Sequence, residues 1–521
     1  MKRNTLTSAV LAGIGGVAGL AGIANAVNLN PDGLGEVLIY PYYTVNNGNQ
    51  TLLSVVNTTN TVKAVKVRFL DGKNSREVLD FNLYLSPYDV WTGVVLDLEG
   101  DDTGAAAVAT ADTSCTVPSF AQSGVTTSTG LPAVPFRNLL FGTLFEANID
   151  DIDTSLERTR EGHFEMIEMG VVDETVDGDD TGLEDAANHQ ISDPIDVPDD
   201  CAALVAAWVP GGVWNAAGSR GAETDVRAPD GGLFGAASII NVLGGYQASY
   251  NADAIAAFYD PLDPLSTLHN EPGSVQPSLN QADTGSALTV QSIVFNQGTV
   301  VTSDWLVANR VDAVSAVYMH DQIFNEYAVD SVVNGATEWV ATFPTKNFYV
   351  NQDPARLPFT APFDDAVFDD GASCEPIGLG FYNREERDPG VAPGSVDFSP
   401  SPTPILNVPV LCYEAQVITF GQEGGASDIL GSPTASNISL GTVTGDTFEN
   451  GWAFIDFTAN VTAPEHTLTS SDGDVYSGLP VTGFAIQVVN NSTLVDGDGN
   501  NVLSNYAGLF GHRYSKSIVG S

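Results

Sequence analysis

The fold of this chain is decided by two stretches on either side of one turn: Val65-Lys66-Val67-Arg68-Phe69-Leu70 and Leu79-Asp80-Phe81-Asn82-Leu83-Tyr84-Leu85. The turn between them begins Asp71-Gly72-Lys73-Asn74. Apolar side chains occupy every second position, and a period of two is typical of a β-strand. A helix would need apolar spacings of three and four, which are absent. These residues therefore predict a pair of antiparallel strands.

Working outward, two more strand-like runs precede this pair, at residues 35–43 and 52–57. Four strands with turns every 8–12 residues or so are typical of an antiparallel sandwich. A short helix is expected at residues 252–259. We therefore predict an all-β fold of antiparallel β-sandwich (Ig-like) units, with long acidic loops and one or two short helices. Further strand-like runs occupy residues 163–170, 231–242, 313–319, 337–350, 408–420, 452–457 and 481–489.

Composition divides the chain into consecutive parts. A stretch with 11 acidic residues and no Lys or Arg, residues 173–200, is expected to be a solvated insertion. Pro, Gly and Ser concentrate at residues 388–404, which predicts a linker, with a long loop excursion as the alternative. In order, we predict a signal peptide (1–26), an N-terminal β-sandwich (27–100), a central β-rich region that contains the insertion (101–387), the linker (388–404) and a C-terminal β region (405–521).

The N-terminus has the pattern of a secretory signal. Lys2 and Arg3 precede an apolar run at residues 9–23, and Ala24-Asn25-Ala26 is an A-x-A cleavage site. The alternative is a membrane anchor, but the run is short and rich in Gly and Ala, whereas a span needs about 20 apolar residues. No later stretch is long and apolar enough to span as a helix. We therefore expect an exported protein without a transmembrane anchor, at the cell surface, in the periplasm or in the medium.

The charge is almost entirely of one sign. The chain has 65 Asp and Glu against 19 Lys and Arg, a formal net charge of −46. Nucleic-acid binding needs a basic face, and anionic lipid also attracts basic segments, so both partners are excluded by the sign of the charge. Because 43% of the residues are hydrophobic, the chain is not a disordered acidic polymer. The composition suits a protein that stays soluble in salt or holds divalent cations.

Four cysteines, an even number, predict two disulfides in an exported chain. Three pairings are open, and we favour the sequential one, Cys115 with Cys201 and Cys374 with Cys412, because each bond would close a loop-rich insertion. Buried free thiols are the alternative. No C-x-x-C pair occurs, which argues against a zinc ribbon or a thioredoxin-like site.

Six stretches along the chain resemble a family of exported or cell-surface proteins of Gram-negative bacteria whose members are uncharacterised. This resemblance implies an exported or periplasmic protein, and it carries no catalytic residue to this chain. The stretches are Gly35–Val45, Leu85-Ser86-Pro87-Tyr88-Asp89-Val90-Trp91-Thr92, Glu161–Gly170, Gly232–Val242, Glu338–Val350 and Leu479-Pro480-Val481-Thr482-Gly483-Phe484.

A calcium site is predicted in one acidic loop. Asp496, Asp498 and Asn500 place oxygen ligands at alternate positions, the spacing at which a loop curls around Ca²⁺. The loop is not an EF-hand, because Asn501 and Ala507 stand where Gly and Glu are required. The alternative is that Asp, Gly and Asn simply form turns. Weaker clusters are residues 177–180, residues 472–474, and Asp97, Glu99, Asp101 and Asp102.

Catalytic motifs are absent: there is no G-x-S-x-G, no H-E-x-x-H and no P-loop. His163, Glu165 and Glu168 lie close in sequence, but on a strand Glu168 faces away from the other two. His320, Asp321 and Glu326 are an equally loose group. The six tryptophans could line a sugar-binding face, although their apolar neighbours favour core packing. They are Trp91, Trp208, Trp214, Trp305, Trp339 and Trp452.

Three functions follow from these patterns. The favoured one is a non-enzymatic, structural, surface-layer-like protein of the cell envelope that assembles with itself into a lattice or filament. The second is a secreted binding or adhesion module for carbohydrate or cell-envelope glycan, which exposed aromatic side chains on one sheet face would favour. The third is a hydrolase, which would need a deep cleft with two carboxylates about 5–9 Å apart.

Overall fold

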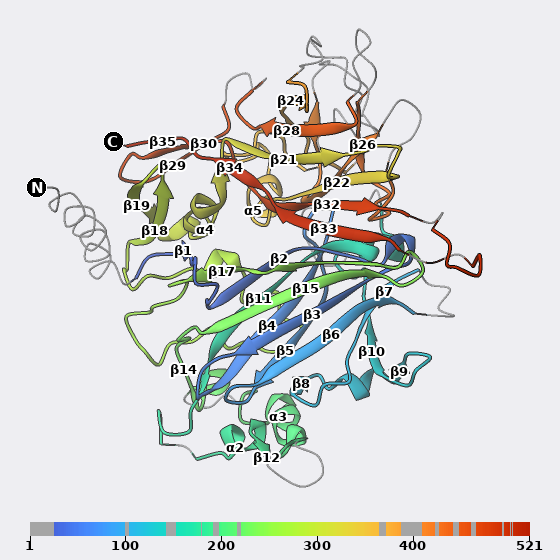
Figure 1. Ribbon diagram of the computed structural model, residues 1–521. Helices are drawn as coiled ribbons and strands as arrows, with labels where there is room; N and C mark the ends of the chain where they lie inside the picture. Colours follow the sequence, from blue (N-terminus) through green and yellow to red (C-terminus); the bar gives the residue numbers. More distant parts are fainter. Residues whose placement is uncertain are drawn as a thin grey trace, which may run out of the picture.

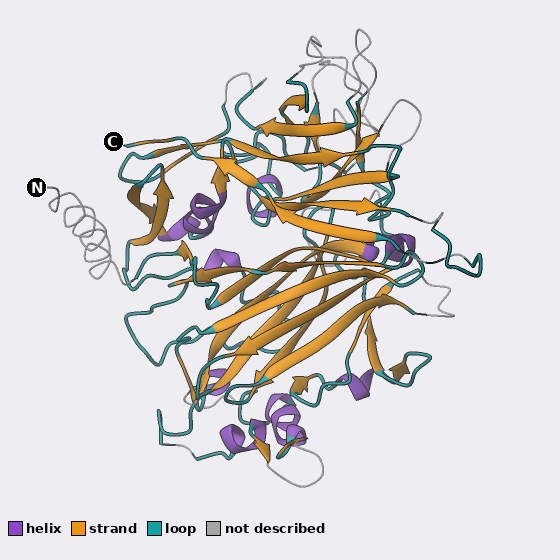
Figure 2. Cartoon of the chain, in the orientation of Figure 1, coloured by secondary structure: helices purple, strands orange, loops and turns teal. Residues whose placement is uncertain are grey.

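The computed structural model of the chain is dominated by strands, with a few short helices (Figure 2). The predicted signal peptide up to Ala24, the predicted linker, and Glu99, Asp101 and Asp102 lie outside the described residues. The structure describes residues 25–98, 104–141, 153–178, 180–190, 197–215, 220–363, 371–386, 409–421, 427–440, 448–459, 465–491, 494–500, 502 and 504–520.

Two sheets form the first sandwich (Figure 1). The eight-stranded sheet has the order β1 (Asn28–Leu29), β17 (Asp253–Ala256), β2 (Val37–Thr44), β11 (Glu161–Val172), β4 (Val62–Asp71), β5 (Glu77–Leu85) and β8 (Cys115–Val117), and β14 (Val226–Arg227) pairs with β11. The seven-stranded sheet has the order β16 (Tyr246–Asn251), β15 (Leu233–Asn241), β3 (Asn49–Asn57), β6 (Val90–Asp97), β7 (Ala106–Ala109), β10 (Pro132–Pro135) and β9 (Val125–Thr126).

The strand pair predicted from residues 65–85 is confirmed. β4 and β5 are antiparallel, with Val67 opposite Phe81. Phe69 and Val67 share a buried cluster with Leu53 and Val55 of β3, which belongs to the other sheet. The apolar half of the alternating pattern therefore forms the core between the two sheets.

The second unit also has two sheets (Figure 1). The four-stranded sheet has the order β24 (Gly378–Asn383), β28 (Asn450–Asp456), β21 (Gln322–Ala328) and β34 (Arg513–Ser515). The five-stranded sheet has the order β27 (Ser436–Ser439), β26 (Ala415–Gly421), β22 (Gly335–Thr342), β32 (Thr482–Val489) and β33 (Tyr506–Gly511), in which β26 and β27 are parallel. Short two- or three-stranded sheets are formed by β12 (His189–Gln190) with β13 (Val197–Pro198), β18 (Thr289–Asn296) with β19 (Thr299–Leu306), β20 (Met319–His320) with β31 (Leu479–Pro480), β23 (Glu375–Pro376) with β25 (Val410–Leu411), and β29 (Thr467–Thr469), β30 (Val475–Ser477) and β35 (Ile518–Val519).

The five-stranded sheet has two buried faces. Trp339 of β22 packs on Phe420, with ring centroids 5.0 Å apart, inside the second unit. Phe484 of β32 points the other way and stacks on Tyr250 of the first sandwich, with ring centroids 5.2 Å apart. The two units therefore share a hydrophobic core.

Three local predictions need correction. Residues 252–259 contain strand β17 instead of a helix, because their backbone groups complete the ladder beside β2. Residues 313–318 of the run at 313–319 belong to helix α4 (Val311–Tyr318), and Met319 begins strand β20. All residues of α4 are buried, and a fully buried helix has the same apolar pattern as a buried strand. The strand predicted over 337–350 ends at Thr342. The remaining described α-helices are α2 (Leu183–Ala187), α3 (Cys201–Trp208) and α5 (Asn347–Val350).

The predicted boundary at residue 100 does not separate two sheets. Apart from β12 and β13, which pair with each other, strands β7 to β17 complete the sheets that β2 to β6 begin, and they reach Ala256. The described residues of the predicted acidic insertion (173–200) lie at one end of this sandwich, where α2 and α3 pack together (Figure 1). In the described part of the chain, none of the helices has the length and apolar character needed to cross a membrane.

Candidate functional site

Four aromatic side chains form a patch on the outer face of the four-stranded sheet. Tyr382 of β24 pairs with Trp452 of β28, and in the neighbouring row Phe454 pairs with Phe324 of β21. Because side chains alternate along a strand, the residue between Trp452 and Phe454, Ala453, points into the core. We call Phe324, Tyr382, Trp452 and Phe454 the aromatic patch.

Three of the four rings of the patch contact one another. Tyr382 and Trp452 stack with centroids 5.0 Å apart and planes at 18°, and Trp452 lies 5.9 Å from Phe454. Gly380, opposite Phe454, leaves room for that ring, since a Cβ at this position would collide with it. The aromatic side chains therefore occupy one continuous area of the sheet.

Trp452 differs from the other tryptophans in its exposure. It is 44% exposed, whereas each of the other five is at most 8% exposed. Five of the six thus serve core packing, the more conservative of the two sequence interpretations. The sequence alone could not single out Trp452, because it also lies in an apolar strand run.

Polar groups border the aromatic patch. Glu326 is paired with Trp452 across the β21–β28 ladder and is exposed. At the end of the same two strands, Gln322 Nε2 donates a hydrogen bond of 2.9 Å to Asp456 Oδ2. The patch thus combines ring surfaces with carboxylate and amide groups, which is the usual composition of a specific binding site.

A second feature is a groove of about 820 Å³ between loops of the two units. Its lining includes four asparagines, but their donors serve the protein itself: Asn334 Nδ2, for example, binds the carbonyl of Asn490 at 3.0 Å. Tyr246 donates to the carbonyl of Ile429 at 3.1 Å. Among the described lining residues Asp428 is the one carboxylate, whereas a glycosidase needs two. The groove therefore marks the seam between the units.

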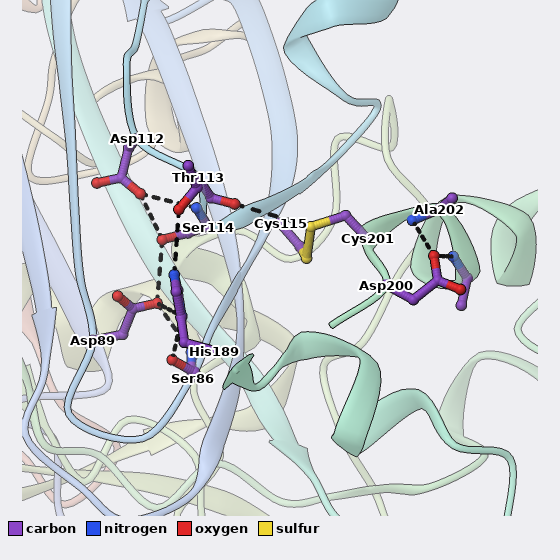
Figure 3. Close-up of a disulfide and its surroundings, with 11 residues drawn as sticks. Ser86, Asp89, Asp112, Thr113, Ser114, Cys115, His189, Asp200, Cys201 and Ala202 are labelled. Atoms are coloured by element: carbon purple, nitrogen blue, oxygen red, sulfur yellow. Dashed lines mark hydrogen bonds and ion pairs between the residues drawn. A yellow bond between two sulfur atoms is a disulfide. The ribbon is translucent and has the colours of Figure 1, made fainter. Parts of the chain in front are cut away.

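A Ser, a His and an Asp meet beside the first disulfide (Figure 3). Ser86 Oγ lies 2.7 Å from His189 Nδ1, and Asp89 Oδ2 lies 3.7 Å from the same nitrogen. A catalytic triad needs the serine and the carboxylate on opposite ring nitrogens. Here Nε2 instead faces Thr113 Oγ1 at 3.4 Å. The cluster is suited to holding the insertion against the sandwich.

The disulfides have the sequential pairing that the sequence favours. Cys115 is bonded to Cys201, which joins β8 to the start of α3 (Figure 3), and Cys374 is bonded to Cys412. The bonds close stretches of 86 and 38 residues. Closed disulfides are typical of oxidising compartments outside the cytosol.

The acidic and histidine groups considered for catalysis do not converge. Glu165 pairs with Arg68, whereas Glu168 pairs with Lys63. His163 is fully buried, its ring has no hydrogen-bond partner among the described residues, and burial lowers its pKa to about 4. The other group separates as well: His320 is buried against Tyr514, Asp321 accepts a hydrogen bond from Ser515, and Glu326 is exposed.

The predicted calcium loop forms a turn held by its own side chains. Asp496 Oδ1 accepts hydrogen bonds from the backbone N–H groups of Asp498 and Asn500 at 2.9 and 2.8 Å. Hydrogen bonds from Asn500 lower the pKa of the Asp496 carboxyl. Over the described residues, no group of three or more His, Cys, Asp or Glu side chains is arranged to hold a metal ion. The calcium site stays a prediction.

The sequence analysis missed a set of buried ion pairs that join neighbouring strands of the eight-stranded sheet. On β4, Lys66 pairs with Asp80 of β5 at 2.6 Å, and Arg68 pairs with Glu77 of β5 at 2.7 Å. Lys63 is also buried on this strand. One signal was available: three of only 19 basic residues fall within residues 63–68, on a predicted strand.

Comparisons of this chain with family models, with curated proteins and with solved structures found no match. The resemblance to exported surface proteins therefore stays a prediction, and function has to be argued from the residues themselves.

Proposed function

We propose that this is an exported, non-enzymatic protein of the cell envelope that binds glycan through the aromatic patch. The observation that carries the proposal is the exposure of Trp452 in a stacked aromatic group, in a chain that buries its other five tryptophans. Exposed apolar surface costs about 25 cal/mol for each Å² left in water. An exposed tryptophan stacked on half-buried aromatic rings is therefore a mark of an interaction site.

A sugar ring fits this surface chemically. The face of an aromatic ring is electron-rich, and it attracts the C–H hydrogens on one side of a pyranose. Glu326 and Asp456 beside the patch can accept hydrogen bonds from hydroxyl groups. The net charge of −46 disfavours a polyanionic ligand, so we expect a neutral polysaccharide.

The test is a pull-down with insoluble polysaccharides, namely cellulose, chitin and purified peptidoglycan, in buffer with high salt. Trp452→Ala should weaken binding about tenfold or more, which corresponds to about 1.4 kcal/mol. Phe295→Ala is the matched control, because Phe295 is 56% exposed on the separate β18–β19 hairpin. The proposal fails if the wild-type protein binds none of these polysaccharides, or if the Trp452 variant binds as well as the control.

Self-assembly into a structural layer is the second candidate. One observation favours it: β33 ends the five-stranded sheet and exposes Tyr506 and Phe510, which are 66% and 47% exposed. An edge strand offers backbone groups to another chain. Sedimentation of the mature protein distinguishes the two functions, because a glycan-binding module stays monomeric when it is concentrated and a lattice protein assembles.

A further inference from the structure

A lysine, a glutamate and an aspartate meet where the two sheets of the first sandwich are connected. Lys63 Nζ of β4 lies 2.9 Å from Glu168 Oε1 of β11 and also contacts Asp230 Oδ1. Lys63 and Glu168 are completely buried, and the Asp230 side chain is 36% exposed. Asp230 lies in the turn between β14 and β15, so it precedes a strand of the other sheet.

The turn holds Asp230 in position. Gly231 and Gly232 have positive φ angles of 78° and 84°, which favour glycine. This backbone directs the N–H groups of Asp230 and Gly231 to the Glu168 carboxylate, at 3.1 and 2.8 Å. Arg227 binds Asp230 Oδ2 at 2.8 Å, which leaves Oδ1 to Lys63.

We propose that Lys63 and Asp230 are joined by an intramolecular isopeptide bond, formed spontaneously with Glu168 as the proton relay. Nothing beyond the folded chain is required. An ammonium and a carboxylate that condense to an amide release one water molecule, and the two charges disappear together. The completely buried Lys63 ammonium carries a desolvation penalty that a neutral amide avoids, so the site favours the product.

The steps balance as follows. Lys63 gives one proton to Glu168, and its Nζ lone pair attacks Cγ of Asp230. As the C–Oδ1 bond breaks, two of the three ammonium protons reach the departing oxygen through Glu168, and water leaves. Glu168 ends in its initial state, and the third proton stays on the amide nitrogen.

The surroundings of Glu168 suit a relay. Burial raises the pKa of the Glu168 carboxyl, against the effect of Lys63 beside it. Burial also raises the pKa of the nearby Glu36 to about 8, and repulsion from Glu168 adds to this effect. Carboxyl groups that hold a proton more readily than usual are suited to accept one and return it.

The bond would link β4 covalently to the turn that leads into the other sheet, across 167 residues of chain. A cross-link of this kind removes conformations from the unfolded state, as a disulfide does. Unlike the two disulfides, an amide resists reducing agents, so the first sandwich would stay linked after reduction.

The experiment is peptide mass spectrometry of the mature, folded protein after reduction, alkylation and trypsin digestion. We expect a branched peptide in which Lys63 is joined to Asp230, lighter than its two components by one water molecule, with no cleavage after Lys63. Glu168→Gln keeps the shape of the relay residue but cannot carry the proton, and it should slow bond formation about 100-fold or more.

Asp80→Asn is the matched control. Asp80 of β5 pairs with Lys66, which lies on β4 with Lys63 but away from the relay residue Glu168. The substitution should leave the branched peptide unchanged. The proposal is overturned if the folded wild-type protein yields Lys63 and Asp230 only in separate, unmodified peptides. The role of Glu168 is overturned if the Glu168→Gln protein forms the bond as fast as the wild type.

Discussion

At the scale of single residues, burial in this protein raises the pKa of individual carboxyl groups. Glu414 illustrates this. It accepts a hydrogen bond from Ser75 through Oε2, and Oε1 has no hydrogen-bond partner within the described ranges. Burial raises the pKa of the Glu414 carboxyl from 4.5 to about 8, so the folded protein holds a proton here near neutral pH.

Glu414→Gln should therefore reduce the dependence of stability on pH. Because the folded-state pKa lies above the unfolded value, the contribution of Glu414 to stability is complete below about pH 4.5 and is lost as the pH rises through about 8. The loss amounts to at most about 1.4 kcal/mol per pH unit. Glutamine imitates the protonated acid and does not titrate.

Urea unfolding at a series of pH values from about 5 to 8 measures the free energies of both proteins. Other buried acids, such as Glu338 with a pKa raised by burial to about 7, affect both proteins equally, so the difference between the curves isolates Glu414. Parallel curves would contradict the assignment.

At the scale of elements, the loop at residues 496–500 shows how a turn and a metal site can share a sequence. Each oxygen of Asp496 already accepts a hydrogen bond from within the loop, so the turn forms without an ion. A bound cation would replace these donors with a stronger interaction at the same oxygens. The hydrogen bonds within the loop therefore account for the turn, and calcium binding is tested by the following experiment.

Calcium should raise the melting temperature at fixed ionic strength, and Asp496→Asn should abolish this effect. A native-state site stabilises by mass action, by about 2.7 kcal/mol at 100 times its dissociation constant. Melting curves in constant high NaCl, with millimolar Ca²⁺ or with chelator, measure the difference. Asp32→Asn, at an exposed turn position outside the acidic clusters, is the control. Identical curves with Ca²⁺ and chelator would identify the loop as a simple turn.

At the scale of the whole molecule, the shared core makes the two units one folding system. Phe484 contacts Tyr250 and Tyr42 of the first sandwich, with centroid distances of 5.2 and 6.5 Å. Trp91 is buried in the first unit and Trp339 in the second. Both regions should therefore lose structure in the same unfolding transition.

Phe484→Ala should destabilise the protein by about 3–5 kcal/mol, the usual effect of a large cavity in a core. It should also separate the unfolding of the two units. Hydrogen exchange with mass spectrometry at a series of denaturant concentrations follows the peptides around Trp91 and Trp339, and so reports on each unit separately. Phe295→Ala, at an exposed position, should change stability by about 0.5 kcal/mol or less. Coincident transitions in the Phe484 variant would show that the units are coupled elsewhere.

What the sequence by itself determined was local and periodic. The alternation at residues 65–85 specified strands β4 and β5, because a period of two places apolar side chains on one face wherever the strands pair. The sequential pairing of Cys115 with Cys201 could likewise be favoured from the loops that it closes. These inferences depend on neighbours in the chain and not on distant partners.

Only the tertiary structure decided which surfaces were buried and which distant residues met. Lys66 and Arg68 alternate with apolar residues as exposed residues would, yet both are buried, because the eight-stranded sheet is covered on both faces. Trp452 lies in an apolar run, yet it is exposed, because its side chain is on the face of the four-stranded sheet that points away from the core of the described residues. Lys63 meets Asp230 only through the pairing of β4, β11 and β14. Burial and contact depend on strands that lie far apart in sequence, and periodicity within one strand carries no information about them.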